Sequence, residues 1–219
     1  RLLEIQDFFS EEADEILDTL VEIGEPAIQP LIEDYLGCED VYYGEELTFE
    51  ISQALGAIGQ PAIKALITAL DSENGFIHSN SARALGQIGD RQAIEPLKNA
   101  IHKYESYAAL YGLAQIGGDD VAQFLLGLLE SEKFEKASII GWLGHTQSDL
   151  VFESLKQALE DDDPEVRRSA VWSLRTLNQQ RAIDLLVSLL NDPDYGVQYA
   201  TAIVLVTDFR DNRAAPFFA

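Results

Sequence analysis

The spacing of hydrophobic and polar residues predicts helical hairpins. In the segment Leu85-Gly86-Gln87-Ile88-Gly89-Asp90, apolar residues three apart end in a glycine and an aspartate, which is typical of a helix that stops in a tight turn. The segment Ala93-Ile94-Glu95-Pro96-Leu97 follows at once and has the pattern of a second helix. We therefore expect two helices joined by a short turn.

The same pattern recurs along the chain at a nearly constant period. One leucine of each second helix recurs in steps of 35, 31, 28, 30 and 31 residues, at Leu31, Leu66, Leu97, Leu125, Leu155 and Leu186. A second marker agrees, because Asp163-Pro164 and Asp192-Pro193 are 29 residues apart. Hairpins repeated at a fixed period indicate a solenoid, in which each repeat buries its apolar face against its neighbours.

The predicted fold is an all-α solenoid, a right-handed superhelix of about six to seven hairpins of ~30 residues with one concave face. We expect one array over residues 1–219. Its predicted units are 10–37, 45–71, 75–103, 104–130, 132–160, 163–190 and an incomplete 193–219.

Two sets of residues are expected in the core. Alanines recur at equivalent positions and should let paired helices approach closely: Ala54, Ala82 and Ala170 in first helices, and Ala62, Ala93 and Ala182 in second helices. An apolar and aromatic stripe in the fourth unit is interpreted as core packing, the alternative being an aromatic platform for a ligand: Tyr104, Tyr107, Leu110, Tyr111 and Leu113.

The repeat resembles a known class. The segment Asp163-Pro164-Glu165-Val166-Arg167, together with the Leu85–Leu97 pattern, is similar to the short HEAT-like repeat named after the phycobilisome (phycobiliprotein) lyases. The resemblance covers residues 10–219. The Val-Arg step becomes Ile77-His78 and Val197-Gln198 elsewhere, so a recurring ladder of arginines is not expected.

This resemblance implies a phycobilin lyase subunit or chromophore-handling chaperone, which would hold a linear tetrapyrrole (bilin) and its acceptor protein, often as a heterodimer of two HEAT-like chains. The repeat architecture itself favours a second function, a protein-binding solenoid.

Charge narrows the choice of partner. The chain has 38 Asp and Glu against 15 Lys and Arg, a net charge of −23. Sixteen of the acids lie in residues 1–50, where Arg1 is the single base. Such a field repels nucleic-acid phosphates and anionic membranes, so neither is expected as a partner, and it favours a protein with a basic surface. A plain solvated surface remains the alternative.

Cysteine content, apolar runs and the first residue indicate the compartment and the nature of the chain ends. There is one cysteine, Cys38, next to Glu39-Asp40, so an internal disulfide is excluded and a reactive thiolate is disfavoured. No apolar run reaches the ~20 residues of a membrane span, and no signal segment opens the chain. We expect a cytoplasmic protein. Because the sequence begins at Arg1 and has no Met, we expect a trimmed or mature segment of a longer chain.

Signatures of catalysis are missing from the sequence. The histidines, His78, His102 and His145, are scattered and none precedes a Glu, unlike the repeated His-Glu pairs of the di-iron HEAT-like hydroxylases. There is no Cys-x-x-Cys, His-Glu-x-x-His, P-loop or dinucleotide-binding glycine motif. No catalytic residue, metal or resident cofactor is assigned. The enzymatic alternative is a bilin lyase-type subunit, with the bilin as its ligand.

We place the candidate binding surface on the second helices, which usually line the concave face of such arrays. Its polar positions are Gln60, Lys64, Arg91, Glu95, Lys98, His102, Gln123, Glu153, Lys156, Arg181 and Asp184. The long loop of Tyr42 and Tyr43 is a further candidate contact. Each of these residues has the alternative of being an ordinary solvated or packed side chain.

The sequence thus predicts a non-catalytic protein–protein interaction scaffold, which binds its partner through the concave face or through the acidic residues 1–50. The phycobilin lyase subunit or chaperone is the alternative. The sequence leaves the identity of the partner and the oligomeric state open.

Overall fold

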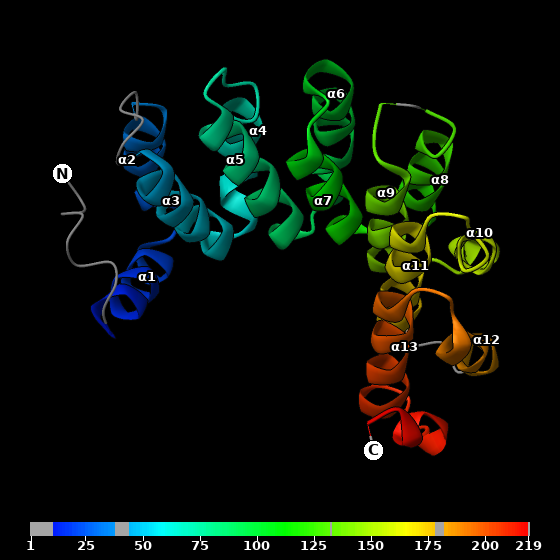
Figure 1. The fold of residues 1–219 in the computed structure, drawn as a ribbon. Coiled ribbons are helices and arrows are strands. Elements are labelled where there is room, and N and C mark those ends of the chain that lie inside the picture. Colours follow the sequence, from blue (N-terminus) through cyan, green and yellow to red (C-terminus); the bar gives the residue numbers. More distant parts are fainter. Residues whose placement is uncertain (1–10, 38–43, 132, 178–181, 219) are drawn as a thin grey trace. The chain divides into compact units, whose positions relative to one another are not determined.

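A computed structural model describes residues 11–37, 44–131, 133–177 and 182–218 (Figure 1). Every regular element among these residues is a helix, so the all-α class is confirmed. The chain divides into two compact units, which we call unit 1 (up to Ile116) and unit 2 (from Gly117).

Unit 1 is a stack of helical hairpins. Its first helices, α1 (Glu11–Ile23), α3 (Gly44–Ile58), α5 (Gly75–Ile88) and α7 (Tyr107–Ile116), contact one another in sequence. Its second helices are α2 (Glu25–Leu36), α4 (Ile63–Ala69) and α6 (Ile94–Tyr104), and they form a second row beside the first (Figure 1). Short 3₁₀ turns, η1 (Gln60–Ala62) and η2 (Arg91–Ala93), precede α4 and α6.

Unit 2 repeats this arrangement. It begins with α8 (Asp119–Leu128), and α9 (Lys136–Leu143), α11 (Pro164–Leu177) and α13 (Tyr195–Thr207) form its row of first helices. Their partners are α10 (Phe152–Ala158), α12 (Ile183–Ser188) and the 3₁₀ helix η7 (Asn212–Phe218). Shorter 3₁₀ turns join these helices: η3 (Gly144–Thr146), η4 (Asp149–Val151) and η6 (Leu189–Asn191).

The predicted turn chemistry is seen at Gly89 and Asp90. Gly89 ends α5 in the left-handed conformation (φ 72°), which costs glycine little because it has no Cβ. Its N–H donates to the Leu85 carbonyl (3.2 Å). The Asp90 carboxylate then accepts the Gln92 N–H (2.8 Å) and caps η2.

The core sits between the two rows of helices in each unit. All six leucines that define the repeat period are fully buried: Leu31, Leu66, Leu97, Leu125, Leu155 and Leu186. The six alanines predicted at the helix contacts are buried too, with at most 2% of their surface exposed. The sequence period therefore marks the buried seam of each hairpin.

The tightest helix contact in unit 1 lies at glycines. A Cβ on Gly112 of α7 would lie 2.2 Å from the Ala82 carbonyl oxygen of α5. A Cβ on Gly86 would lie 2.5 Å from the Gly112 Cα. The backbones of α5 and α7 therefore touch where neither helix carries a side chain.

The boundary between the units, at Ile116 and Gly117, falls inside the predicted fourth hairpin, 104–130. The single array over 1–219 therefore stays a prediction, whereas the hairpin stack is observed within each unit.

The prediction that the whole aromatic stripe of the fourth unit packs in the core is wrong. Tyr104 is the last residue of α6, and Glu105 (φ 51°) ends that helix, so the stripe spans two helices. In α7, Leu110 and Leu113 are fully buried, but Tyr107 and Tyr111 are 43% and 37% exposed. The helix break turns these two tyrosines to the outer face of α7.

Candidate functional site

The predicted second-helix surface is largely exposed in both units. In unit 1 it comprises Gln60, Lys64, Arg91, Glu95, Lys98 and His102, all exposed except the half-buried Lys98. In unit 2 it comprises Gln123, Glu153, Lys156 and Asp184, all exposed. Arg181, Tyr42, Tyr43 and Cys38 lie outside the described residues. The role of this surface in binding stays a prediction.

Some members of the surface are engaged with neighbours. Gln60 donates a hydrogen bond to the Asp90 carboxylate of the next hairpin (3.0 Å). The hydrogen bonds from the Gln92 backbone N–H and from Gln60 hold the pKa of Asp90 below its ordinary value. Lys98 pairs with Glu95 on the same helix (2.9 Å). These side chains therefore form contacts between neighbouring repeats and within one helix.

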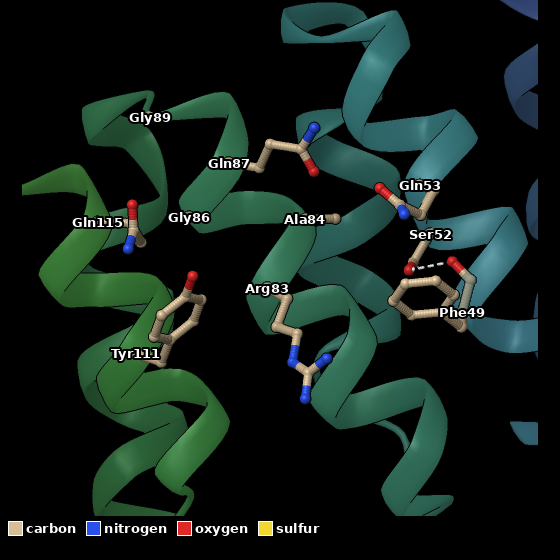
Figure 2. Close-up of a pocket in the computed structure, with 10 residues that line it drawn as sticks. All are labelled: Phe49, Ser52, Gln53, Arg83, Ala84, Gly86, Gln87, Gly89, Tyr111 and Gln115. Atoms are coloured by element: carbon tan, nitrogen blue, oxygen red, sulfur yellow. Dashed lines mark hydrogen bonds between the residues drawn. The ribbon is translucent and has the colours of Figure 1, made fainter. Parts of the chain in front are cut away.

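A hollow opens on the other side of unit 1, on the row of first helices (Figure 2). Its volume is about 430 Å³. Residues from α3, α5 and α7 line it: Phe49, Ser52, Gln53, Arg83, Ala84, Gly86, Gln87, Gly89, Tyr111 and Gln115. We call it the α3–α5–α7 hollow.

The α3–α5–α7 hollow combines a cation, amides and aromatic rings. Figure 2 shows Arg83 of α5 with Phe49 of α3 on one side and Tyr111 of α7 on the other. Three glutamines add hydrogen-bonding groups: Gln53, Gln87 and Gln115. None of the ten described residues that line it is acidic, although the chain has 38 acids. The hollow is therefore a local exception to the negative charge of the protein.

Helix periodicity explains how these side chains come together. Arg83 and Gln87 are four residues apart, as are Tyr111 and Gln115, so each pair lies on one face of its helix. The two pairs occupy equivalent repeat positions. One pair lies two residues on either side of the buried Leu85, and the other lies two residues on either side of the buried Leu113. Stacking of the repeats brings these outward positions side by side.

Gly56 makes room for one of the amides. A Cβ on Gly56 of α3 would lie 3.2 Å from the Gln87 side-chain oxygen of α5. The Gln87 amide therefore lies close to the α3 backbone. The sequence analysis missed the hollow, because it placed the candidate binding surface on the second helices. The pairs of polar and aromatic residues at equivalent positions of α5 and α7 could have indicated it.

Two hollows of unit 2 have a different chemistry. One, of about 460 Å³, is lined among others by Glu160, Asp161 and Asp162, and its Lys136 is ion-paired with Asp161. That pairing with Lys136, together with the Asp163 backbone N–H, lowers the pKa of Asp161. A neighbouring hollow contains Glu153 and Glu160 beside Lys156. Both therefore carry carboxylates that the α3–α5–α7 hollow lacks.

The histidines do not form a common site. His78 is buried, His102 is exposed, and burial lowers the pKa of the half-buried His145. Among the described residues, no three His, Cys, Asp or Glu side chains converge so as to hold a metal ion. Likewise, no helix in the described part of the chain has the length and apolar character of a transmembrane span.

Comparison with known protein families identifies the repeat. The HEAT-repeat profile matches residues 45–107 and 152–219, which together make up more than half of the chain. The chain belongs to the HEAT-repeat family. The short hairpin repeat predicted from the sequence is thus confirmed as a HEAT repeat.

Two curated relatives are similar in sequence. The phycocyanobilin lyase subunit alpha of Picosynechococcus sp. is 28% identical over 149 residues, which cover 60% of this chain. The bilin biosynthesis protein PecE of Mastigocladus laminosus is 27% identical over 154 residues, which cover 66% of this chain. The matches span 56% of the length of each relative. The resemblance to lyase-type HEAT proteins is therefore borne out.

A solved structure has a similar fold. It is the complex of CpcE and CpcF of phycocyanin lyase from Nostoc sp. PCC7120, with a TM-score of 0.50 and 18% sequence identity. The match covers 98% of this chain and 90% of that chain. At this identity the likeness supports the fold of the HEAT-repeat chain and not its activity.

Proposed function

We propose that this HEAT-repeat protein is a subunit of the phycobilin lyase type, which holds a bilin and brings it to an acceptor protein. The observation that carries the proposal is that both curated relatives are named for bilins, a phycocyanobilin lyase subunit and a bilin biosynthesis protein. The α3–α5–α7 hollow supports it, because its volume of about 430 Å³ lies in the range of small-molecule sites, roughly 300–1,000 Å³.

The proposed contribution of this chain is binding and orientation. HEAT repeats present long surfaces to other proteins, while aromatic and amide side chains can contact a conjugated pigment. A bilin held against such a surface would be kept near its acceptor, which replaces a bimolecular encounter by a local one.

A titration of phycocyanobilin with the 219-residue protein tests this function. Binding restricts the flexible tetrapyrrole, so we expect a shift of its visible absorption band and an induced circular dichroism signal. A phycobiliprotein apoprotein added to the mixture should co-elute with the chain in size-exclusion chromatography. An unchanged pigment spectrum at saturating protein contradicts the proposal.

The interaction scaffold without a pigment is the second candidate function. The net charge of −23 and the concentration of acids in residues 1–50 favour a partner with a basic surface. Exposed acids of α1, Glu15, Asp18 and Glu22, belong to this region.

The scaffold would be recognised by its salt dependence. A partner purified with the chain should lose affinity as salt rises, and also when Glu11, Glu12, Asp14 and Glu15 are neutralised to Gln and Asn. Binding that resists both changes excludes the electrostatic part of this candidate.

A further inference from the structure

The lack of acidic side chains among the described residues that line the α3–α5–α7 hollow is its most unusual feature. The two unit 2 hollows carry two or more carboxylates each, whereas Arg83 is the only charged residue among the described ones that line this hollow. In a protein with more than twice as many acids as bases, this surface is suited to an anionic ligand.

Among the described residues, Arg83 has no competing partner for such a ligand. It makes no hydrogen bond or ion pair with any residue that the structure describes, and the same holds for Gln53 and Gln87. In contrast, Arg167, Arg168 and Arg175 each pair with a carboxylate of the protein. The Arg83 guanidinium thus retains its full set of donors, in a planar fork that fits a carboxylate.

The rings on either side of Arg83 suit a flat, conjugated molecule. Phe49 is 40% and Tyr111 37% exposed, so both keep surface available for contact. Aromatic side chains contact other π-systems by offset stacking or edge-to-face packing. The amides of Gln53 and Gln87 can each donate to a carbonyl and accept from an N–H.

We infer that the α3–α5–α7 hollow is the bilin-binding site, where Arg83 pairs with a propionate of the pigment while Phe49 and Tyr111 contact its pyrrole rings. The inference rests on the proposed function and assigns it to the first-helix face of unit 1. A linear tetrapyrrole carries every group that the hollow can satisfy: carboxylates, lactam C=O and N–H groups, and flat rings.

The experiment measures the dissociation constant of phycocyanobilin for the full chain and for matched variants. Arg83→Glu should weaken binding roughly fivefold to tenfold, because an attraction at an open site becomes a repulsion. Arg83→Lys should weaken it less, since the charge remains without the fork. Arg210→Glu is the control: it makes the same charge change at an exposed arginine of unit 2 that belongs to neither candidate surface, and it should leave affinity unchanged. Arg91→Glu tests the second-helix surface of unit 1 as the alternative site.

A second pair of variants tests the ring contact on one helix. Tyr111→Ala should weaken binding roughly fivefold through the loss of an aromatic contact. Tyr107→Ala removes a similarly exposed tyrosine of α7 that does not line the hollow, and it should have no effect. Circular dichroism at 222 nm confirms that each variant is folded.

The ligand supplies an independent control. The dimethyl ester of phycocyanobilin lacks the propionate charges, so the wild-type protein should bind it more weakly than the free acid, by a smaller factor than Arg83→Glu loses, because the ester removes the attraction without adding a repulsion. An Arg83→Gln variant, which likewise removes the charge without adding a repulsion, should bind the free acid and the ester about equally. Such a cycle isolates the pairing of Arg83 with the carboxylate.

The outcomes distinguish failure of the proposed binding site from failure of the proposed function. If the wild-type protein binds pigment and the Arg83 and Tyr111 variants bind it equally well, the hollow is not the site, although the proposed function survives. If Arg91→Glu weakens binding and Arg83→Glu does not, the second-helix surface holds the pigment and the inference is overturned. If the wild-type protein binds no pigment, both the inference and the proposed function fail.

Discussion

At the residue scale, side chains of different types at one repeat position donate hydrogen bonds from a first helix to the loop that precedes it. In three first helices, α5, α11 and α13, it follows the buried aliphatic residue near the helix start and holds His78, Arg167 or Gln198. Arg167 donates to the Asp161 carbonyl (2.7 Å) in the loop before its own helix. Gln198 donates likewise to the Asp192 carbonyl (2.6 Å).

His78 fills the same position. Its Nδ1 donates to the Leu70 carbonyl (2.7 Å), and its Nε2 lies 2.7 Å from the Ser106 hydroxyl of the following repeat. The position therefore requires a hydrogen-bond donor toward the loop and not a positive charge. This explains why His78 and Gln198 can take the place of the arginine of the Val-Arg step.

Arg167 also reaches the next repeat through a buried ion pair. Its Nε and Nη2 donate to the two carboxylate oxygens of Asp192, both at 2.8 Å. We expect Asp192→Ala to lower the unfolding free energy by about 3 kcal/mol, because it leaves the guanidinium buried without its counter-charge. Urea unfolding followed at 222 nm measures this loss.

The matched control is the exposed pair of Arg175 with Asp208 in the same unit (2.8 Å). Asp208→Ala should cost no more than about 1 kcal/mol, because water screens an exposed pair. Equal losses in the two variants would show that burial of the Arg167–Asp192 pair has no energetic consequence.

The same pair predicts a dependence on pH. Burial raises the pKa of Asp192, but hydrogen bonds from Arg167 and from the Asp194 N–H outweigh it, so the pKa lies below the ordinary value of 3.8. The carboxylate therefore contributes stability above about pH 4, which is lost as pH falls through its folded-state pKa.

Comparison of the wild-type protein with Asp192→Asn checks this sign. The difference in unfolding free energy should be largest near neutral pH and shrink in acid, because the wild-type carboxyl then becomes neutral as well. A difference that stays constant from neutral pH into acid would contradict the assignment.

At the element scale, glycines set how closely α5 and α7 approach. Because a Cβ on Gly112 would overlap the Ala82 carbonyl, we expect Gly112→Ala to lower the unfolding free energy by about 2–3 kcal/mol through forced backbone displacement. The same variant should distort the α3–α5–α7 hollow, whose Arg83 and Tyr111 sit on the two displaced helices.

Gly127→Ala in α8 is the matched control, since no atom lies within 4 Å of its added Cβ. It should raise stability by roughly 0.5–1 kcal/mol, the cost of glycine relative to alanine inside a helix. Thermal and urea unfolding of the two variants measures the contrast, and a loss of stability in both would rule out close approach as the cause at Gly112.

At the scale of the whole molecule, charge opposes folding. With 38 acids and 15 bases, most carboxylates have no cationic partner available, and self-repulsion destabilises compact states. Raising salt from about 10 mM to about 150 mM shortens the screening length from ~30 Å to ~8 Å. We expect the melting temperature to rise by roughly 2–4 °C, which corresponds to ~1 kcal/mol for a chain of this size.

Neutralisation of the exposed acids of α1 supplies the control. A variant with Glu15, Asp18 and Glu22 changed to Gln and Asn should melt higher at low salt and respond less to added salt. A melting temperature that falls with salt would mean that attractive ion pairs, and not repulsion, dominate the electrostatics.

The sequence by itself determined the helices, their turns and their buried seam. Apolar spacing, Gly89 and Asp90 act over a few residues, and the period placed all six marker leucines in the core. It also placed the polar residues of the second helices at the surface. These features depend on local geometry, which the order of residues specifies directly.

Only the tertiary structure decided what the outward positions of the first helices do. Arg83 and Tyr111 line one hollow, and Arg167 pairs with Asp192, because stacked repeats bring together residues that are 28 and 25 positions apart in the sequence. The buried period does not constrain these outward side chains. Their encounter depends on how closely neighbouring helices pack, which is set at contacts such as that of Gly112 with Ala82.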